Sequence, residues 1–164
     1  MSFGAADTHR VKELLAAEIK KVTTPFPGVR NVELKRPNVR QVDEFINRFS
    51  FVVGGGKRRI NTWIFEPATN ATDPLIQAGA FFKTSTFPIT GYLSFSDSKD
   101  TDEEIEELLE AIEDQLLEDL TLGGQVITIT EIRTGQGAPV FFGKYLTHVA
   151  LIEVDVEYRK QKVS

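Results

Sequence analysis

The sequence predicts an α+β fold, with one mostly antiparallel β-sheet and two main α-helices packed on one face. Two segments carry apolar residues at spacings of three and four, as helices do, and several others are rich in β-branched residues. Their order is helix, strand, an irregular middle, strands, helix, then two or three strands, which is typical of this class. The length of 164 residues suits a single domain spanning 1–164.

The first helix is expected to begin at Asp7 or Thr8, either of which can cap it. Its apolar stripe is Val11, Leu14, Leu15, Ile19 and Val22. The segment TTPFPG ends the helix, and RNVELKRP then predicts a short strand closed by Pro37. Residues 38–53 predict a short helix followed by a strand in FSFVV.

The middle of the chain alternates strands and turns. The segments INTWIFEP and GYLSFS predict strands, GGGKRR predicts a turn, and ATNATDP predicts a loop. The apolar stretch between that loop and GYLSFS is interrupted by Gly79 and Pro88.

The second main helix is strongly acidic. Thr101 and Glu104 have the spacing of a capping box, and Gly123 with Gly124 is expected to end the helix. Its apolar stripe is Ile105, Leu108, Leu109, Ile112, Leu116 and Leu120.

The chain closes with strands. QVITITEIRT predicts a strand and GQGAP a turn or hairpin tip. In ALIEVDVEYR, small or apolar residues and Tyr158 alternate with Leu151, Arg159 and a row of acids, so one face is dry and the other wet. The acids in that row are Glu153, Asp155 and Glu157.

The composition excludes several kinds of chemistry. The chain has no Cys, which excludes disulfides, thiolate metal sites and Cys nucleophiles. GGGKRR lacks the spacing of a phosphate-binding loop. His9 and His148 are the only histidines, and we interpret His148 as a core or interface residue rather than a general base. We therefore predict no enzyme activity, no catalytic residue, no metal site and no cofactor.

Charge is distributed unevenly. The net charge is −5, yet positions 100–119 hold eleven acids and no base, which leaves thirteen acids against nineteen bases elsewhere. The acidic helix face, with Glu107 and Glu110 at its centre, is either a solvated surface or a contact for a basic surface on another subunit; a metal role is the weakest alternative. The basic stretch that could supply such a contact is Arg30, Lys35, Arg36, Arg40, Arg48, Lys57, Arg58 and Arg59, and the candidate interface residues among them are Arg36, Arg40, Arg58 and Arg59.

Two aromatic segments suggest a second kind of contact. AGAFFKTSTFPITGY and GQGAPVFFGKYL combine Gly, Pro and paired Phe. They are either core hairpins or loops that dock on neighbouring subunits, where aromatic residues serve as anchors. The candidate residues are Phe81, Phe82, Phe141, Phe142 and Tyr145.

DTHRVKELLAAEIKKV, DTDEEIEELLEAIEDQLL after a strand, and the closing strand ALIEVDVEYR together resemble the tail terminator (tail completion) proteins of long-tailed bacteriophages. The resemblance covers 7–35 and 90–159 and rests on element order, because the family has no sharp motif. It implies a structural virion protein without enzyme activity, assembled in the bacterial cytoplasm into a ring, usually a hexamer. Such a ring caps the tail tube, ends its polymerisation and presents a surface to the head connector.

The resemblance leaves two alternatives of the same fold, a neck protein that joins head to tail and a tail-tube protein. An enzyme using the acidic cluster and an unrelated binding domain also stay open. In a ring, the row Glu153, Asp155 and Glu157 would line the bore, through which DNA passes without being held. The alternative for this row is an ordinary solvent-exposed face.

Overall fold

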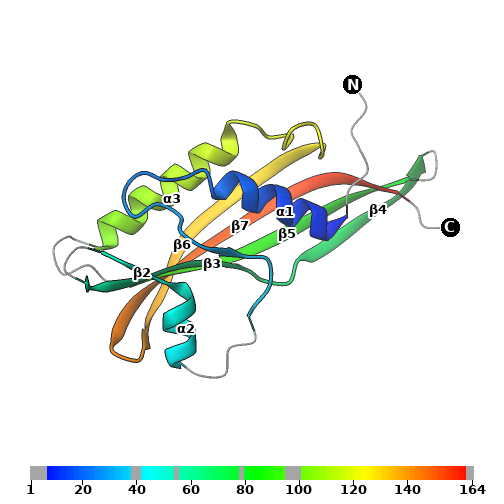
Figure 1. The fold of residues 1–164 in the computed structure, drawn as a ribbon. Helices are drawn as coiled ribbons and strands as arrows, with labels where there is room; N and C mark the ends of the chain where they lie inside the picture. Colours follow the sequence, from blue (N-terminus) through cyan, green and yellow to red (C-terminus); the bar gives the residue numbers. More distant parts are fainter. Residues whose placement is uncertain (1–6, 38–41, 54–55, 78–79, 95–100, 162–164) are drawn as a thin grey trace.

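The computed structural model describes residues 7–37, 42–53, 56–77, 80–94 and 101–161. It contains three helices and a mostly antiparallel seven-stranded sheet, so the predicted mixed architecture is confirmed, although the prediction named only two main helices (Figure 1). The helices are α1 (Thr8–Ile19), α2 (Val42–Phe49) and α3 (Thr101–Leu117). The strands are β1 (Val32–Glu33), β2 (Ser50–Val52), β3 (Arg58–Phe65), β4 (Thr69–Gln77), β5 (Ala80–Ser94), β6 (Thr128–Phe142) and β7 (Tyr145–Gln161).

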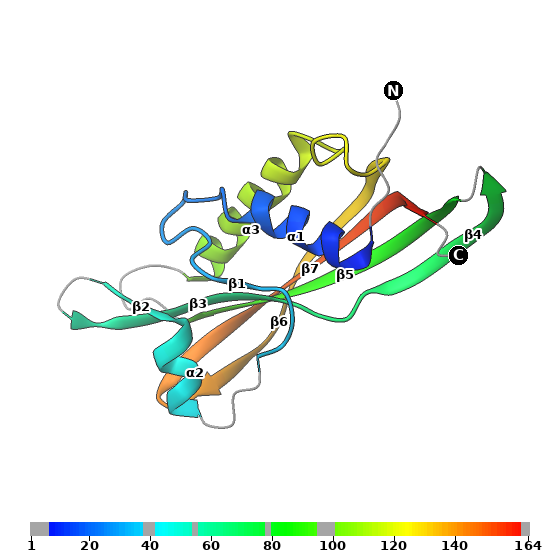
Figure 2. The same cartoon turned by 45° about the vertical axis from the view of Figure 1, so that its right-hand side comes forward.

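The sheet has the strand order β1-β3-β5-β7-β6, with β2 paired to β3 and β4 paired to β5. Only the short β1–β3 pair is parallel. Strands β5, β6 and β7 are 15, 15 and 17 residues long, so each extends roughly 50 Å at the usual strand rise. Figures 1 and 2 show these strands reaching past the helices, and the β6–β7 hairpin projects from one end of the sheet.

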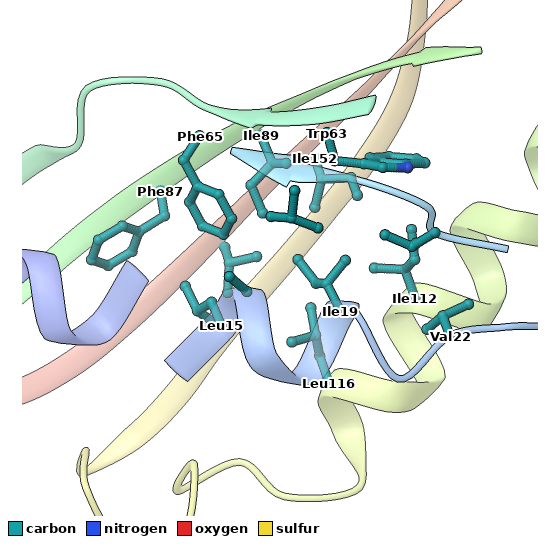
Figure 3. Packing of buried hydrophobic residues seen from close by; sticks show 14 of the residues in the cluster. Leu15, Ile19, Val22, Trp63, Phe65, Phe87, Ile89, Ile112, Leu116 and Ile152 are labelled. Carbon is teal, nitrogen blue, oxygen red and sulfur yellow. The ribbon is translucent and has the colours of Figure 1, made fainter. Parts of the chain in front are cut away.

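One hydrophobic core joins α1, α3 and the facing side of the sheet. Leu15 and Ile19 of α1 and Ile112 of α3 are fully buried and belong to one cluster with the inward residues of β3, β5 and β7 (Figure 3). The strand residues in this cluster include Trp63, Phe65, Phe87, Ile89, Ile152, Val154 and Val156. The predicted two-residue alternation of the last strand is confirmed, since Ile152 and Val154 are buried while Glu153 is exposed.

Helix α2 lies apart from that core, on the other side of the sheet from α3 (Figures 1 and 2). The Phe45 ring stacks on Phe142 with centroids 4.4 Å apart and meets Tyr92 edge-on at 6.2 Å. Phe49 is buried beside β3. The short helix and strand predicted within 38–53 are thus confirmed, and the helix covers part of the second sheet face.

Several sequence-based expectations for the turns and helix ends were wrong. ATNATDP forms most of β4, because backbone pairing with β5 offsets its low strand propensity. GQGAP lies inside β6, with a bulge between Gly137 and Val140, and the hairpin turns at Gly143, whose φ is +59°.

The acidic helix also ends earlier than expected. It stops at Leu117, and Leu120 is 38% exposed rather than part of the core stripe. Gly123 and Gly124 instead form a later turn, in which the Asp119 carboxylate accepts a hydrogen bond from the Gly123 backbone N–H. The hydrogen bond from the Thr121 hydroxyl, together with the one from Gly123, lowers the pKa of Asp119.

Candidate interaction surfaces

The acidic face of α3 points into solvent. Glu107 and Glu110 are both exposed, and within the described residues neither forms an ion pair or side-chain hydrogen bond. A groove runs between this helix and β6, lined by Asp102, Glu106 and Glu110 and by the strand residues Thr134 to Gln136. No group of three or more His, Asp or Glu side chains in the described part of the chain is arranged to hold a metal ion.

The basic residues do not form one surface. Arg36 is exposed and binds Glu66 through Nε, 2.8 Å from Oε2, and through Nη2, 2.9 Å from Oε1. These hydrogen bonds raise the pKa of Arg36. Arg58 is exposed and donates to the Ser50 hydroxyl at 3.0 Å. Arg40 lies outside the described residues.

Arg59 corrects the predicted basic surface. It is only 9% exposed, and its guanidinium donates to Oε1 of Glu104 at 2.8 Å and to the Ser94 carbonyl at 3.2 Å. This buried ion pair ties β3 to the first turn of α3. Arg59 therefore has a structural role inside the subunit, and its charge is not available to a neighbour.

The aromatic candidates also separate into two groups. Phe141 at the β6–β7 hairpin is 70% exposed, the highest exposed fraction among the large apolar side chains that the structure describes, whereas its neighbour Phe142 packs on Phe45 and Tyr92. Tyr145 is half-buried, with the Lys144 ammonium 5.6 Å from its ring centre.

At the other end of the sheet, Phe82 is half-buried in β5, opposite Arg159 of β7. Phe81 pairs with Ile76 of β4 through the backbone, and its side chain lies outside the description. Of the three paired Phe residues whose side chains are described, Phe141 is thus the exposed one.

The sequence implied that the acidic row of β7 is a line of uncompensated like charges, but in the structure a basic residue pairs with part of it. Arg133 of β6 reaches across to Asp155, at 2.8 and 2.9 Å, and to Glu153 at 2.9 Å. It also binds Glu131 at 2.7 Å, and the Thr86 hydroxyl donates to Asp155 at 2.7 Å. Hydrogen bonds from Arg133 and Thr86 lower the pKa of Asp155, and the carboxylates raise the pKa of Arg133.

The remaining member of the row, Glu157, is half-buried opposite Thr84 of β5. One arginine thus compensates part of the negative charge on this outer face. The sequence could have pointed to this contact, because Arg133 occurs in the neighbouring predicted strand, but the register of that strand was not known.

His148 is buried at 5% exposure on the inward face of β7, as expected of a core histidine. Its Nδ1 lies 3.5 Å from the carboxylate of Asp102, which is itself largely exposed at the start of α3.

A further surface group was not predicted from the sequence, which named only its Arg30, as part of the basic stretch. The guanidinium of Arg30 lies over the Phe51 ring, 4.4 Å from its centre, and 5.5 Å from the centre of the Phe26 ring. The two rings meet edge-on at 6.2 Å, and Phe26 is 53% exposed. We call Phe26, Arg30 and Phe51 the cation–aromatic platform.

Buried Asn61 of β3 positions this platform. Its side-chain amide donates to the Gly28 carbonyl at 2.7 Å, and its carbonyl oxygen accepts from the Arg30 backbone N–H at 3.2 Å and from the Trp63 indole at 3.0 Å. Gly28 has a φ of +67°, and a Cβ there would lie 2.7 Å from the Thr23 backbone. The hydrogen bonds from Asn61 and the tight turn at Gly28 thus fix the loop after α1 in the path that brings Phe26 and Arg30 next to Phe51.

No known family model matches this chain, and no curated protein matches it. No helix in the described part of the chain is long and apolar enough to cross a membrane. The chain is a mixed α/β protein with three notable surfaces: an acidic helix, an exposed aromatic hairpin and a cation–aromatic platform.

Proposed function

We propose that this protein is a structural virion component that forms a ring, a hexamer in the family that it resembles, on the end of a bacteriophage tail tube. The ring ends tube polymerisation and presents the surface to which the head connector attaches. Its partners are further copies of itself, the tail-tube protein and the connector, and DNA passes through it without specific binding. It is assembled in the bacterial cytoplasm, resides in the virion and has no enzyme activity.

The observation that carries this proposal is the exposed Phe141 at the projecting β6–β7 hairpin. Leaving most of a Phe ring in water forgoes roughly 1.5–3 kcal/mol of burial free energy. Val140 beside it is 37% exposed, so the hairpin carries an apolar tip at the end of a two-stranded arm. A tip of this kind is typical of a protein–protein contact.

The proposal includes the finer architecture predicted from the sequence, in which α1 and α3 form one helical layer on one face of the sheet. The shared core of these two helices supports this part of the proposal. With this layer, the acidic face of α3 points outward, and the long strands extend uncovered beyond the helices. These are two separate surfaces, and a subunit that contacts two neighbours in a ring needs two.

In the ring, the outer sheet face with Glu153, Asp155 and Glu157 lines the bore. Arg133 neutralises part of this row but leaves an excess of acid around it, since it faces Glu131 as well as Glu153 and Asp155. A wall with excess negative charge repels phosphates, which favours free passage of DNA.

Electron microscopy and native mass spectrometry of the purified chain, alone and with tube subunits of the same phage, test the proposal. Rings on tube ends and tubes of limited length are expected. Phe141→Ser should leave a folded subunit that no longer joins rings or tubes, whereas Val52→Ser, at a side chain that is 61% exposed elsewhere, should assemble normally. Unrestricted tube growth with the wild-type chain present would refute the terminator function.

The same experiment separates the related alternatives. A neck protein would bind the connector but leave tube growth unchanged. A tail-tube protein would polymerise by itself into long tubes. Both alternatives have the same fold as a terminator, and neither requires a catalytic site.

A further inference from the structure

The cation–aromatic platform has the composition of an interaction hot spot, in which aromatic and Arg side chains contribute most of the binding free energy. Phe26 comes from the loop after α1 and Phe51 from β2, so two separate segments build it. The Arg30 Nε is held by a hydrogen bond to the Pro27 carbonyl at 3.0 Å. The guanidinium is therefore fixed before any partner binds, which reduces the entropy cost of binding.

Arg30 has no counter-ion among the described residues, unlike several other arginines of the chain. Arg36, Arg59 and Arg133 each pair with a carboxylate, whereas no carboxylate of the described residues pairs with Arg30. An exposed, immobilised and uncompensated cation beside a half-exposed aromatic ring favours a partner that is acidic and apolar at once.

The chain itself carries one surface of that kind. Leu117 at the end of α3 is 52% exposed and lies on the acidic face of the helix. Glu110 and Asp114 precede it by seven and three residues, so the three side chains share one strip of the helix surface. Both acids are exposed, and neither is paired within the described residues.

From this complementarity we infer that the platform Phe26–Arg30–Phe51 binds the strip Glu110–Asp114–Leu117 of a second copy of this chain. Leu117 contacts the two rings, and Asp114 with Glu110 neutralises Arg30. The inference rests on the proposed ring and names the two surfaces that join its subunits.

The geometry suits a head-to-tail contact. The platform and the strip are different surfaces, so each subunit can use its platform on one neighbour and its strip on the other. Such heterologous contacts close into rings or continue as filaments. A two-fold dimer would instead have to engage both pairs of surfaces at once.

Charge reversal provides the test. Arg30→Glu places an acid against Asp114, and Asp114→Arg places a base against Arg30, so each variant alone should associate about tenfold more weakly or worse. In an equimolar mixture the reversed pair attracts, and the other interface of an alternating ring keeps the native Arg30 and Asp114. Assembly should therefore return only when the two variants are mixed, as measured by analytical ultracentrifugation and native mass spectrometry.

Matched controls carry the same charge changes away from the proposed contact. Glu103→Arg lies on the same helix face, about 21 Å along the axis from Leu117, and should assemble like the wild type. Arg10→Glu on α1 should also be neutral. Circular dichroism of each variant checks that the subunit is folded.

The absence of Cys from the sequence permits a second measurement that does not require a stable ring. A Phe26→Cys chain mixed with a Leu117→Cys chain should form a heterodimeric disulfide under mild oxidation. A Phe26→Cys chain mixed with Glu103→Cys should not. This trapping reports even weak contacts between monomers.

The outcomes separate this interface from the proposed function. Normal rings from folded Arg30→Glu and Asp114→Arg chains would overturn the interface while leaving the ring intact. Loss of assembly without recovery in the mixture, or absence of the Phe26–Leu117 crosslink, would also overturn it. A crosslink between the Phe26→Cys and Leu117→Cys chains, together with a wild-type chain that never limits tube growth, would support the interface and refute the terminator function.

Discussion

The environment of Asp155 in the folded protein differs from the one that its sequence neighbours suggest. In the sequence it is the middle of three like charges, and in the fold it accepts hydrogen bonds from Arg133 and Thr86. These donors favour its charged form and lower its pKa below that of the unfolded chain. Its contribution to stability is therefore present above the unfolded-state pKa of about 3.9 and is lost as the pH falls through the lower folded-state pKa.

We expect Asp155→Asn to lower the free energy of unfolding at pH 7 and to have a smaller effect near pH 2, because the contribution of the carboxylate is lost as the pH falls through its lowered folded-state pKa. Urea unfolding curves at the two pH values measure this difference. Glu106→Gln, which changes an exposed carboxylate on α3, is the control and should have little effect at either pH. An Asp155→Asn penalty that is the same at both pH values would contradict the assignment.

A glycine is needed at position 91 because the Trp63 side chain leaves no room for a Cβ, and not because of its backbone conformation. It lies opposite Trp63 across the β3–β5 pair, and a Cβ at this position would fall 2.5 Å from the indole ring. We expect Gly91→Ala to cost about 1–3 kcal/mol of stability, because the buried indole must move in a close-packed core. Thermal or urea unfolding measures the loss, and Gly135→Ala, where a Cβ meets no atom within 4 Å, is the matched control within a strand.

At the scale of elements, helix α3 has one fully buried apolar face and one exposed acidic face. Ile112 is fully buried against α1 and the sheet, whereas Glu107 is exposed. Ile112→Ala should cost about 2–5 kcal/mol through lost burial and the cavity left behind. Glu107→Gln should leave monomer stability nearly unchanged, and equally mild effects of both changes in urea unfolding would show that the helix is not part of the core.

The β6–β7 hairpin is the element that sequence reasoning located least well. Its paired Phe residues were recognised, but the turn was expected at GQGAP rather than at Gly143. The bulge between Gly137 and Val140 lets Gly- and Pro-containing residues continue in the ladder. The longer arm places Phe141 in solvent and Phe142 against α2, so adjacent aromatic residues have different roles.

At the scale of the whole molecule, the outer sheet face tests the proposed bore. Reversing Glu153 and Glu157 to Lys leaves the hydrogen bonds between Arg133 and Asp155 in place, so the subunit should fold and form rings. If this face lines the bore, the variant rings should retain DNA, with an affinity that falls steeply as salt is added, and DNA passage should stall.

Filter binding over a salt series and plating of phage carrying the variant measure these effects. Glu13→Lys together with Glu103→Lys, at exposed positions on α1 and at the start of α3, makes the same charge change away from the bore and from the proposed subunit contact. Normal infectivity without salt-sensitive DNA binding would assign the acidic row to an ordinary solvent-exposed face.

The sequence by itself determined the elements whose apolar periodicity is strong. It located α1 and α3, the inward and outward faces of β7 and the short helix within 38–53, because spacing along the chain decides which side chains share a face. It also predicted His148 to be a core or interface residue, and His148 is buried. It named Phe141 as a candidate contact.

Only the tertiary structure decided which charges remain free and which segments extend into strands. Arg59 and Glu104 are 45 residues apart, Arg133 and Asp155 are 22 apart, and Phe26 meets Phe51 across 25 positions, so no local pattern encodes these contacts. Strand register and loop path bring such residues together. The same long-range pairing forms β4 from a segment with poor strand propensity, since backbone hydrogen bonds to a neighbouring strand outweigh local preference.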